Sequence, residues 1–88
     1  MRTEPLYRSA ERWGNEIQLI MCVEEMSELT KEISKYFRGQ DNIQEITEEM
    51  GDVYITLEQL KVVFNIPAKK ISDIIEEKIK RLEKRLEE

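Results

Sequence analysis

Residues 23–28 read VEEMSE, and residues 49–52 read EMGD. Residues three apart in an α-helix lie one turn apart on the same side, so each segment presents a pair of carboxylates if it is helical. The pairs are Glu25 with Glu28 and Glu49 with Asp52. A tight turn between the two segments would fold the helices into an antiparallel hairpin and bring the four carboxylates together.

Four clustered carboxylates repel one another, so the pattern predicts a cation between them. A hard divalent ion suits oxygen ligands, which favours Mg²⁺, with Mn²⁺ as the alternative. The chain has no histidine and a single cysteine, Cys22. A Cys/His zinc site, a Ser-His-Asp triad and a Cys-His nucleophile are therefore excluded within it. We predict chemistry on a phosphate-bearing substrate held by the metal.

Apolar residues recur with helical spacing along the chain and predict an all-α fold in a single domain, residues 1–88. After a loose lead-in over 1–5, we expect a short helix over 6–13 and a long one over 15–37, which Gly39 ends. Asp41 is the expected N-cap of a third helix, from 42 to about 65. Pro67 opens a final helix that runs to about Leu86.

The third predicted helix carries an acid at the edge of its apolar side. Along the helix axis, Glu49 lies one turn after Ile46 and one turn before Val53. On the helical wheel it lies beside Leu60. A carboxylate in such a place costs up to several kcal/mol unless it is paired or bound to metal. A buried salt bridge to Lys or Arg is the structural alternative. For Glu24 or Glu32, taken alone, a solvated face is the expectation.

The second predicted helix has an apolar side of its own, and we interpret Cys22 as a small buried hydrophobe within it. Its members are Leu19, Cys22, Met26, Leu29, Ile33 and Phe37.

Length and charge limit the partners. An 88-residue monomer buries only about two-thirds of its unfolded surface, so oligomerisation is expected. The net charge of −5 argues against nucleic acid and anionic membranes as partners. No apolar run approaches a membrane span and no signal peptide is visible, so we expect a soluble cytoplasmic protein.

Glu24-Glu25-x-x-Glu28 followed by Glu49-x-x-Asp52 resembles the EExxE…ExxD signature of the MazG-like all-α nucleoside triphosphate pyrophosphohydrolases. The flanks fit as well, and the resemblance covers most of the chain. They are Arg12-Trp13-Gly14, Gln18, Gly51-Asp52-Val53-Tyr54, Ile66-Pro67, Lys78 and Arg81.

This resemblance implies Mg²⁺-dependent hydrolysis of (deoxy)nucleoside triphosphates to monophosphate and pyrophosphate, in a house-cleaning role. It implies a dimer or tetramer of four-helix-bundle type, in which the hairpin and its flanking helices assemble. It also implies that Glu24 orients the attacking water and that four acids bind the metal. These ligands are Glu25, Glu28, Glu49 and Asp52.

The phosphates of such a substrate need cations. Lys31 and Lys35 follow Glu28 on the same helical side, and Lys78 and Arg81 lie on or near the inward side of the last helix. Lys78 is the best candidate, because it falls on an apolar stripe, although a snorkelling stem with a solvated head is the alternative. Trp13, the only tryptophan, either stacks on a base or packs in the core.

Two other functions fit the same pattern. In one, the chain is a helical interaction protein whose last helix forms a coiled-coil seam and whose acids are surface residues. In the other, the chain binds nucleotide and metal as a sensor without turnover. The seam would use Ile71, Ile75, Lys78, Leu82 and Arg85.

Overall fold

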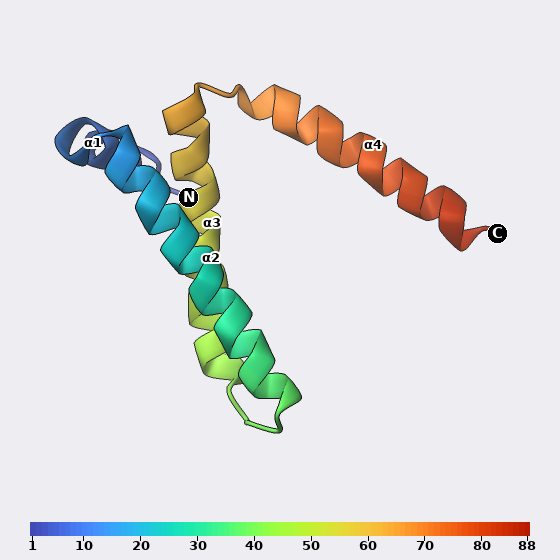
Figure 1. Ribbon diagram of the computed structural model, residues 1–88. Helices are drawn as coiled ribbons and strands as arrows, with labels where there is room; N and C mark the ends of the chain where they lie inside the picture. Colours follow the sequence, from blue (N-terminus) through green and yellow to red (C-terminus); the bar gives the residue numbers. More distant parts are fainter.

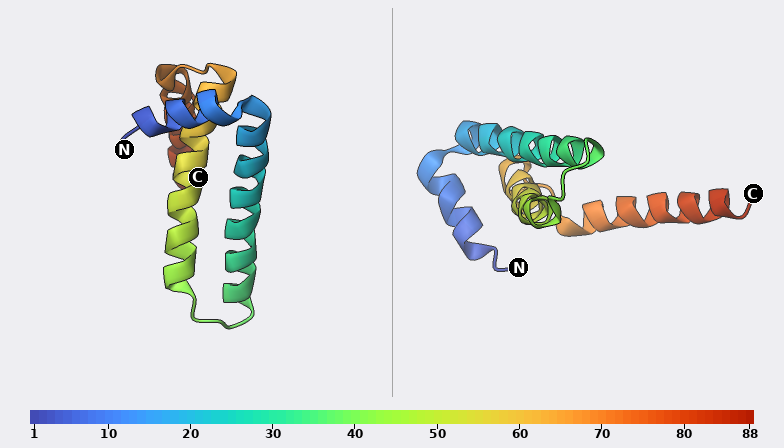
Figure 2. Two further views of the ribbon diagram at one scale, coloured as in Figure 1. Left: turned by 90° about the vertical axis from the view of Figure 1, so that its left-hand side faces the viewer. Right: turned by 90° about the horizontal axis from the view of Figure 1, so that it is seen from below.

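The computed structural model describes residues 1–88 and consists of four α-helices without strands. They are α1 (Glu4–Trp13), α2 (Asn15–Phe37), α3 (Ile43–Phe64) and α4 (Ala68–Leu86). α2 and α3 form an antiparallel hairpin, α1 folds back across its open end, and α4 extends away from it (Figures 1 and 2). The predicted all-α fold is confirmed, and the predicted bounds of α2 are those of the structure.

The start of α1 differs from the prediction. Residues 4 and 5 belong to the helix, so the lead-in comprises three residues instead of five. Pro5 fits because the first turn of a helix leaves its N–H groups unpaired in any case. α1 then ends at Gly14, whose φ of 83° turns the chain sharply into α2.

The turn that closes the hairpin depends on Gly39. This glycine has a φ of 93°, which residues with a side chain rarely adopt. Its N–H donates to Tyr36 O at 3.0 Å, and the next N–H, of Gln40, donates to Lys35 O at 3.1 Å. These two bonds are the Schellman pattern at a helix C-terminus, and they confirm the prediction that Gly39 ends the second helix.

The start of α3 is tied to α2 by a side chain that the sequence analysis missed. The N-cap is Asn42, and the prediction of Asp41 is therefore wrong by one residue. Instead of capping α3, Asn42 Nδ2 donates to the backbone oxygen of Glu32 at 2.8 Å and to its Oε2 at 2.7 Å. Glu32 is buried by this contact, so the expectation of a solvated Glu32 is also wrong.

The contact between α2 and α3 is rich in polar groups. Cys22 is the single fully buried hydrophobe, as predicted for that residue, and its Sγ donates to Thr56 O at 3.6 Å. Burial raises the pKa of the Cys22 thiol. The rest of the predicted apolar side of α2 is only partly covered, since Met26 and Phe37 are 37% and 83% exposed. The side of α2 that faces α3 is a neighbouring one, which includes Glu25 and Glu32.

The molecule is open for its size. Its radius of gyration is 15.9 Å, whereas a compact chain of this length has about 12 Å. The difference comes from α4, which packs on no other helix beyond its first turns (Figure 1). None of the four helices has the length and apolar character that crossing a membrane requires.

Candidate metal centre

Three of the predicted ligands converge in the middle of the hairpin. Glu25 comes from α2, and Glu49 and Asp52 come from α3. One carboxylate oxygen from each lies within 4.8 Å of the other two. Glu25 and Glu49 are half-buried, while Asp52 is exposed, so solvent reaches the cluster at Asp52.

The hairpin contact itself positions these acids. On α2, Glu25 lies one turn after Cys22 and one turn before Leu29, and all three residues are at least half-buried. On α3, Glu49 has the same relation to Ile46 and Val53. Positions that a hairpin normally fills with apolar side chains are thus occupied by carboxylates that the neighbouring apolar groups shield from water.

Burial and mutual repulsion disfavour ionisation of the cluster. The pKa of Glu25 is raised, first by burial and then by the charges of Asp52 and Glu49. The pKa of Glu49 is raised, again first by burial and then by Asp52 and Glu28. Both shifts are in the direction expected for carboxylates that share a site without a cation.

No cation of the chain compensates this charge. The four ion pairs of the structure are Glu4–Arg8, Glu32–Lys35, Glu58–Lys61 and Lys69–Asp73. Glu49 belongs to none of them, and its Oε2 is buried without a hydrogen-bond partner. The salt bridge considered as the structural alternative for Glu49 is therefore absent, and an acceptor oxygen is free to bind a ligand.

The other two acids of the motif lie further out. Glu28 is exposed, and although its charge acts on Glu25 and Glu49, its carboxylate is outside the close cluster. Glu24 is exposed and also outside it. The structure therefore brings together three of the four predicted ligands.

The predicted phosphate-binding cations are not gathered around the acids. Lys35 Nζ is paired with Glu32 Oε1 at 3.0 Å, and Lys31 is exposed. Lys78 and Arg81 lie on α4, where they line a shallow hollow of about 270 Å³ with Leu82 and Arg85. α4 extends away from the hairpin (Figure 2), and the hollow of Lys78 and Arg81 is lined by residues of α4 alone, apart from the acids on α2 and α3.

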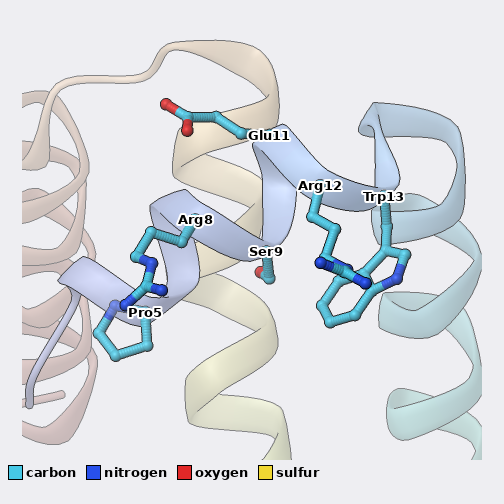
Figure 3. A pocket seen from close by; sticks show the side chains of 6 residues that line it. All are labelled: Pro5, Arg8, Ser9, Glu11, Arg12 and Trp13. Atoms are coloured by element: carbon cyan, nitrogen blue, oxygen red, sulfur yellow. The ribbon is translucent and has the colours of Figure 1, made fainter.

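Trp13 lies on the surface at the end of α1 and is 51% exposed, which does not support the alternative of a core tryptophan. The Arg12 guanidinium carbon lies 5.7 Å from the centroid of its ring. Figure 3 shows the two side chains next to each other at one end of a hollow of about 540 Å³ along α1. Arg12 was not predicted as a site residue, although the spacing of Arg8 and Arg12 places two cations on one side of a helix.

A second polar feature missed from the sequence lies above the acids. Gln18, Thr56 and Gln59 are buried where α1 meets the hairpin. Ser9 Oγ lies 3.5 Å from Gln18 Oε1, and Gln18 Nε2 has no partner. Their spacing in the sequence could have indicated this burial. Gln18 lies one turn before Cys22, and Thr56 lies one turn after Val53, on the sides of α2 and α3 that face each other.

Comparison with known proteins does not assign this chain, since no family model, curated protein or solved structure matches it. The site must therefore be interpreted through its chemistry. Carboxylate oxygens suit Mg²⁺ or Mn²⁺. A divalent ion at such a site neutralises phosphate charge and lowers the pKa of bound water, which is a basis for phosphoanhydride hydrolysis.

Proposed function

We propose that this chain is a Mg²⁺-dependent nucleoside triphosphate pyrophosphohydrolase. The observation that carries the proposal is the half-buried Glu49, which faces Glu25 and Asp52 and has one buried oxygen without a partner. Such an arrangement opposes folding unless a cation joins it. The order and spacing of these acids resemble those of the MazG-like pyrophosphohydrolases, and this resemblance supports a (deoxy)nucleoside triphosphate as substrate.

In this proposal Glu25, Glu49 and Asp52 hold the metal, and Glu28 joins them when substrate is bound. Mg²⁺, or Mn²⁺ in its place, supplies charge neutralisation and an acidic bound water. Glu24 orients that water from the solvent side. The water oxygen forms a bond to one phosphorus of the α–β phosphoanhydride while the bond from that phosphorus to the bridging oxygen breaks, so the products are nucleoside monophosphate, pyrophosphate and a proton.

In this proposal the cationic and aromatic residues bind the phosphates and the base of the substrate. Trp13 offers one ring face for stacking on the base, because Arg12 covers the other. Lys31 and Lys35 are the nearest lysines along α2, and Lys35 must exchange its pairing with Glu32 for a phosphate. Lys78 and Arg81 contact phosphate only across copies of the chain. We place this activity in the cytoplasm, on surplus or non-standard nucleotides.

The proposed assembly is a dimer or tetramer in which helices of different copies complete a bundle of four-helix type. The many exposed apolar side chains of α2, α3 and α4 support it. The same exposure favours a second candidate, a helical interaction protein without catalysis. A nucleotide sensor is the third, with the metal site retained and turnover absent.

Metal-dependent stability separates the candidates. We expect Mg²⁺ to raise the thermal midpoint of the chain, because a ligand of the folded state stabilises it by about 2.7 kcal/mol at one hundred times its Kd. The measurement is a thermal melt in EDTA and in a series of Mg²⁺ concentrations. An unchanged midpoint would favour the interaction protein, and a shift with nucleotide but without product would favour the sensor.

A further inference from the structure

We propose that two copies of this chain interlock through α4, with α4 of each copy packed along the apolar side of the partner's α2–α3 hairpin. The inference deepens the proposed assembly, because it names the two surfaces that meet. It rests on that assembly but needs neither the metal nor the hydrolysis. The two accounts can therefore fail separately.

The first surface is one side of the hairpin, which we call the apolar face. Its side chains lie about 100° around each helix from the residues that face the other helix. These side chains form one stripe on α2 and one on α3. Because the two helices are antiparallel, both stripes lie on the same side of the hairpin, opposite Glu28 and Asp52. All of its residues are between 37% and 65% exposed, and they are Val23, Met26, Ile33, Ile43, Met50, Tyr54 and Leu57.

The apolar face continues into the corner where α4 leaves α3. A hollow of about 400 Å³ lies there, and its lining is mostly apolar. Tyr54 and Leu57 line it from α3, and Ile71 and Ile75 line it from α4. The hairpin and α4 thus form the two arms of a V, which is visible in Figure 1. Apolar side chains line the corner where the two arms meet.

The second surface is α4 itself. Its apolar stripe is about half exposed at Ile74, Ile75, Ile79 and Leu82. α4 has 19 residues, and a helix in a protein takes most of its stability from packing an amphipathic face rather than from propensity. Beyond the corner, the chain itself provides nothing for this face to pack against.

The exposed area has the size that a tightly associated homodimer buries. The chain exposes 7316 Å², whereas a compact monomer of 10.5 kDa exposes about 5,400 Å². The excess of about 1,900 Å² per chain gives about 3,800 Å² for two chains. Obligate homodimers bury about 2,000 to 5,000 Å² in total, so the excess matches one dimer contact.

Charge selects α4 as the occupant of the apolar face. Residues 15–66 carry 11 acids and 4 bases, a net charge of −7, and residues 67–88 carry 7 bases and 6 acids, a net charge of +1. Two hairpins placed face to face would repel each other. Two α4 helices in a seam would place Lys78 and Arg85 against their own copies. Pairing α4 with the hairpin avoids both repulsions, because a segment of net charge +1 then meets a segment of net charge −7.

The test is an isotope-filtered NOE spectrum of an equal mixture of ¹³C-labelled and unlabelled chains. It is recorded after the mass of the complex has been measured by light scattering. We expect a dimer with intermolecular NOEs between the methyl groups of Ile75, Ile79 or Leu82 and side chains of the apolar face. Intermolecular NOEs confined to α4 with α4, or to hairpin with hairpin, would retain an assembly but overturn this inference. A monomer at millimolar concentration would overturn both.

A pair of variants gives an independent readout. Leu82→Glu introduces a negative charge into the stripe of α4, and Lys80→Glu places the same side chain on its opposite side by reversing a charge that is already there. We expect the first to weaken the dimer at least tenfold by sedimentation and the second to leave it within about threefold. Equal effects of the two substitutions would contradict the inference. Circular dichroism of each variant shows whether its helices remain formed.

Discussion

At the scale of single residues, Glu49 is the most informative side chain. It lies where a hairpin of this kind needs an apolar group, and both burial and its neighbours raise its pKa. Glu49→Gln keeps the shape and removes the charge. We expect the variant to be more stable than the parent without metal, since repulsion with Asp52 is lost, and to lose the stabilisation by Mg²⁺. Urea unfolding in EDTA and in Mg²⁺ measures both effects.

The neighbouring Glu48 provides the control. It is exposed, and its Oε1 accepts a 3.3 Å hydrogen bond from Gln44 Nε2, which a glutamine at this position can also accept. Glu48→Gln removes the same charge one residue away and should leave the response to Mg²⁺ intact. If Glu49→Gln instead destabilises the protein and neither protein responds to metal, the role of Glu49 is structural.

The metal-free protein should respond to pH in two opposite ways. The raised pKa values of Glu25 and Glu49 mean that the folded state binds their protons more tightly than the unfolded state does. Their ionisation therefore destabilises the fold at neutral pH, and this destabilisation is relieved as pH falls through the raised values. We expect the free energy of unfolding to increase from pH 7 to about pH 5.

Glu32 acts in the other direction. The hydrogen bonds from Asn42 and then from Lys35 lower its pKa, so its contribution to stability is complete above the unfolded pKa and is lost as pH falls through the folded one. Stability should accordingly decrease below about pH 4. Urea unfolding in EDTA across this pH range measures both the predicted increase and the predicted decrease in stability. A continuous decrease from pH 7 downward would contradict the repulsion assigned to the acid cluster.

The sequence predicted some of these residues for physical reasons and missed others. The partial burial of Glu49 followed from helical spacing alone, because Ile46, Val53 and Leu60 surround it on one helix. The burial of Glu32 did not, since it depends on Asn42 across the hairpin turn. The stacking of Arg12 on Trp13 likewise depends on rotamers that no periodicity encodes.

At the scale of elements, the two glycines of the hairpin should respond oppositely to the same substitution. Gly39 has a φ of 93°, and Gly39→Ala should cost about 1–2 kcal/mol of stability for the left-handed backbone. Gly51 lies inside α3 with nothing within 4 Å of an added Cβ, so Gly51→Ala should gain up to about 1 kcal/mol. Denaturant unfolding of both variants measures these changes, and two effects of the same sign would contradict the assigned turn.

The helices themselves could be predicted from the sequence, because the residues that start and stop helices locally agree with the fold. Gly39 and Pro67 mark ends that the structure has within one residue. The contact between α2 and α3 could not be predicted from the sequence as well as the helices could. The sequence assigned the strongest apolar side of α2 to the core, but the structure turns Gln18, Glu25 and Glu32 toward α3. The choice is a tertiary one, since it depends on which side of α2 packs against α3 and not on the spacing within α2 alone.

At the scale of the whole molecule, the proposed assembly and the proposed activity use different sides of the hairpin. The acids face one side and the apolar face occupies the other, so a dimer through α4 leaves the metal centre open to substrate. The apolar stripe of α4 was visible in the sequence as the candidate coiled-coil seam, but the direction of α4 was not, because a helix boundary at Pro67 fixes where α4 begins and not where it points.

The measurement that tests the central claim most directly is product analysis in water enriched in ¹⁸O. Each common nucleoside and deoxynucleoside triphosphate is incubated with the protein and Mg²⁺, and the products are resolved by ³¹P NMR. The account predicts monophosphate and pyrophosphate, product formation that EDTA and Glu49→Gln abolish, and product formation that Glu48→Gln retains. Diphosphate with orthophosphate, or no turnover of any triphosphate together with no stabilisation by Mg²⁺, would contradict it.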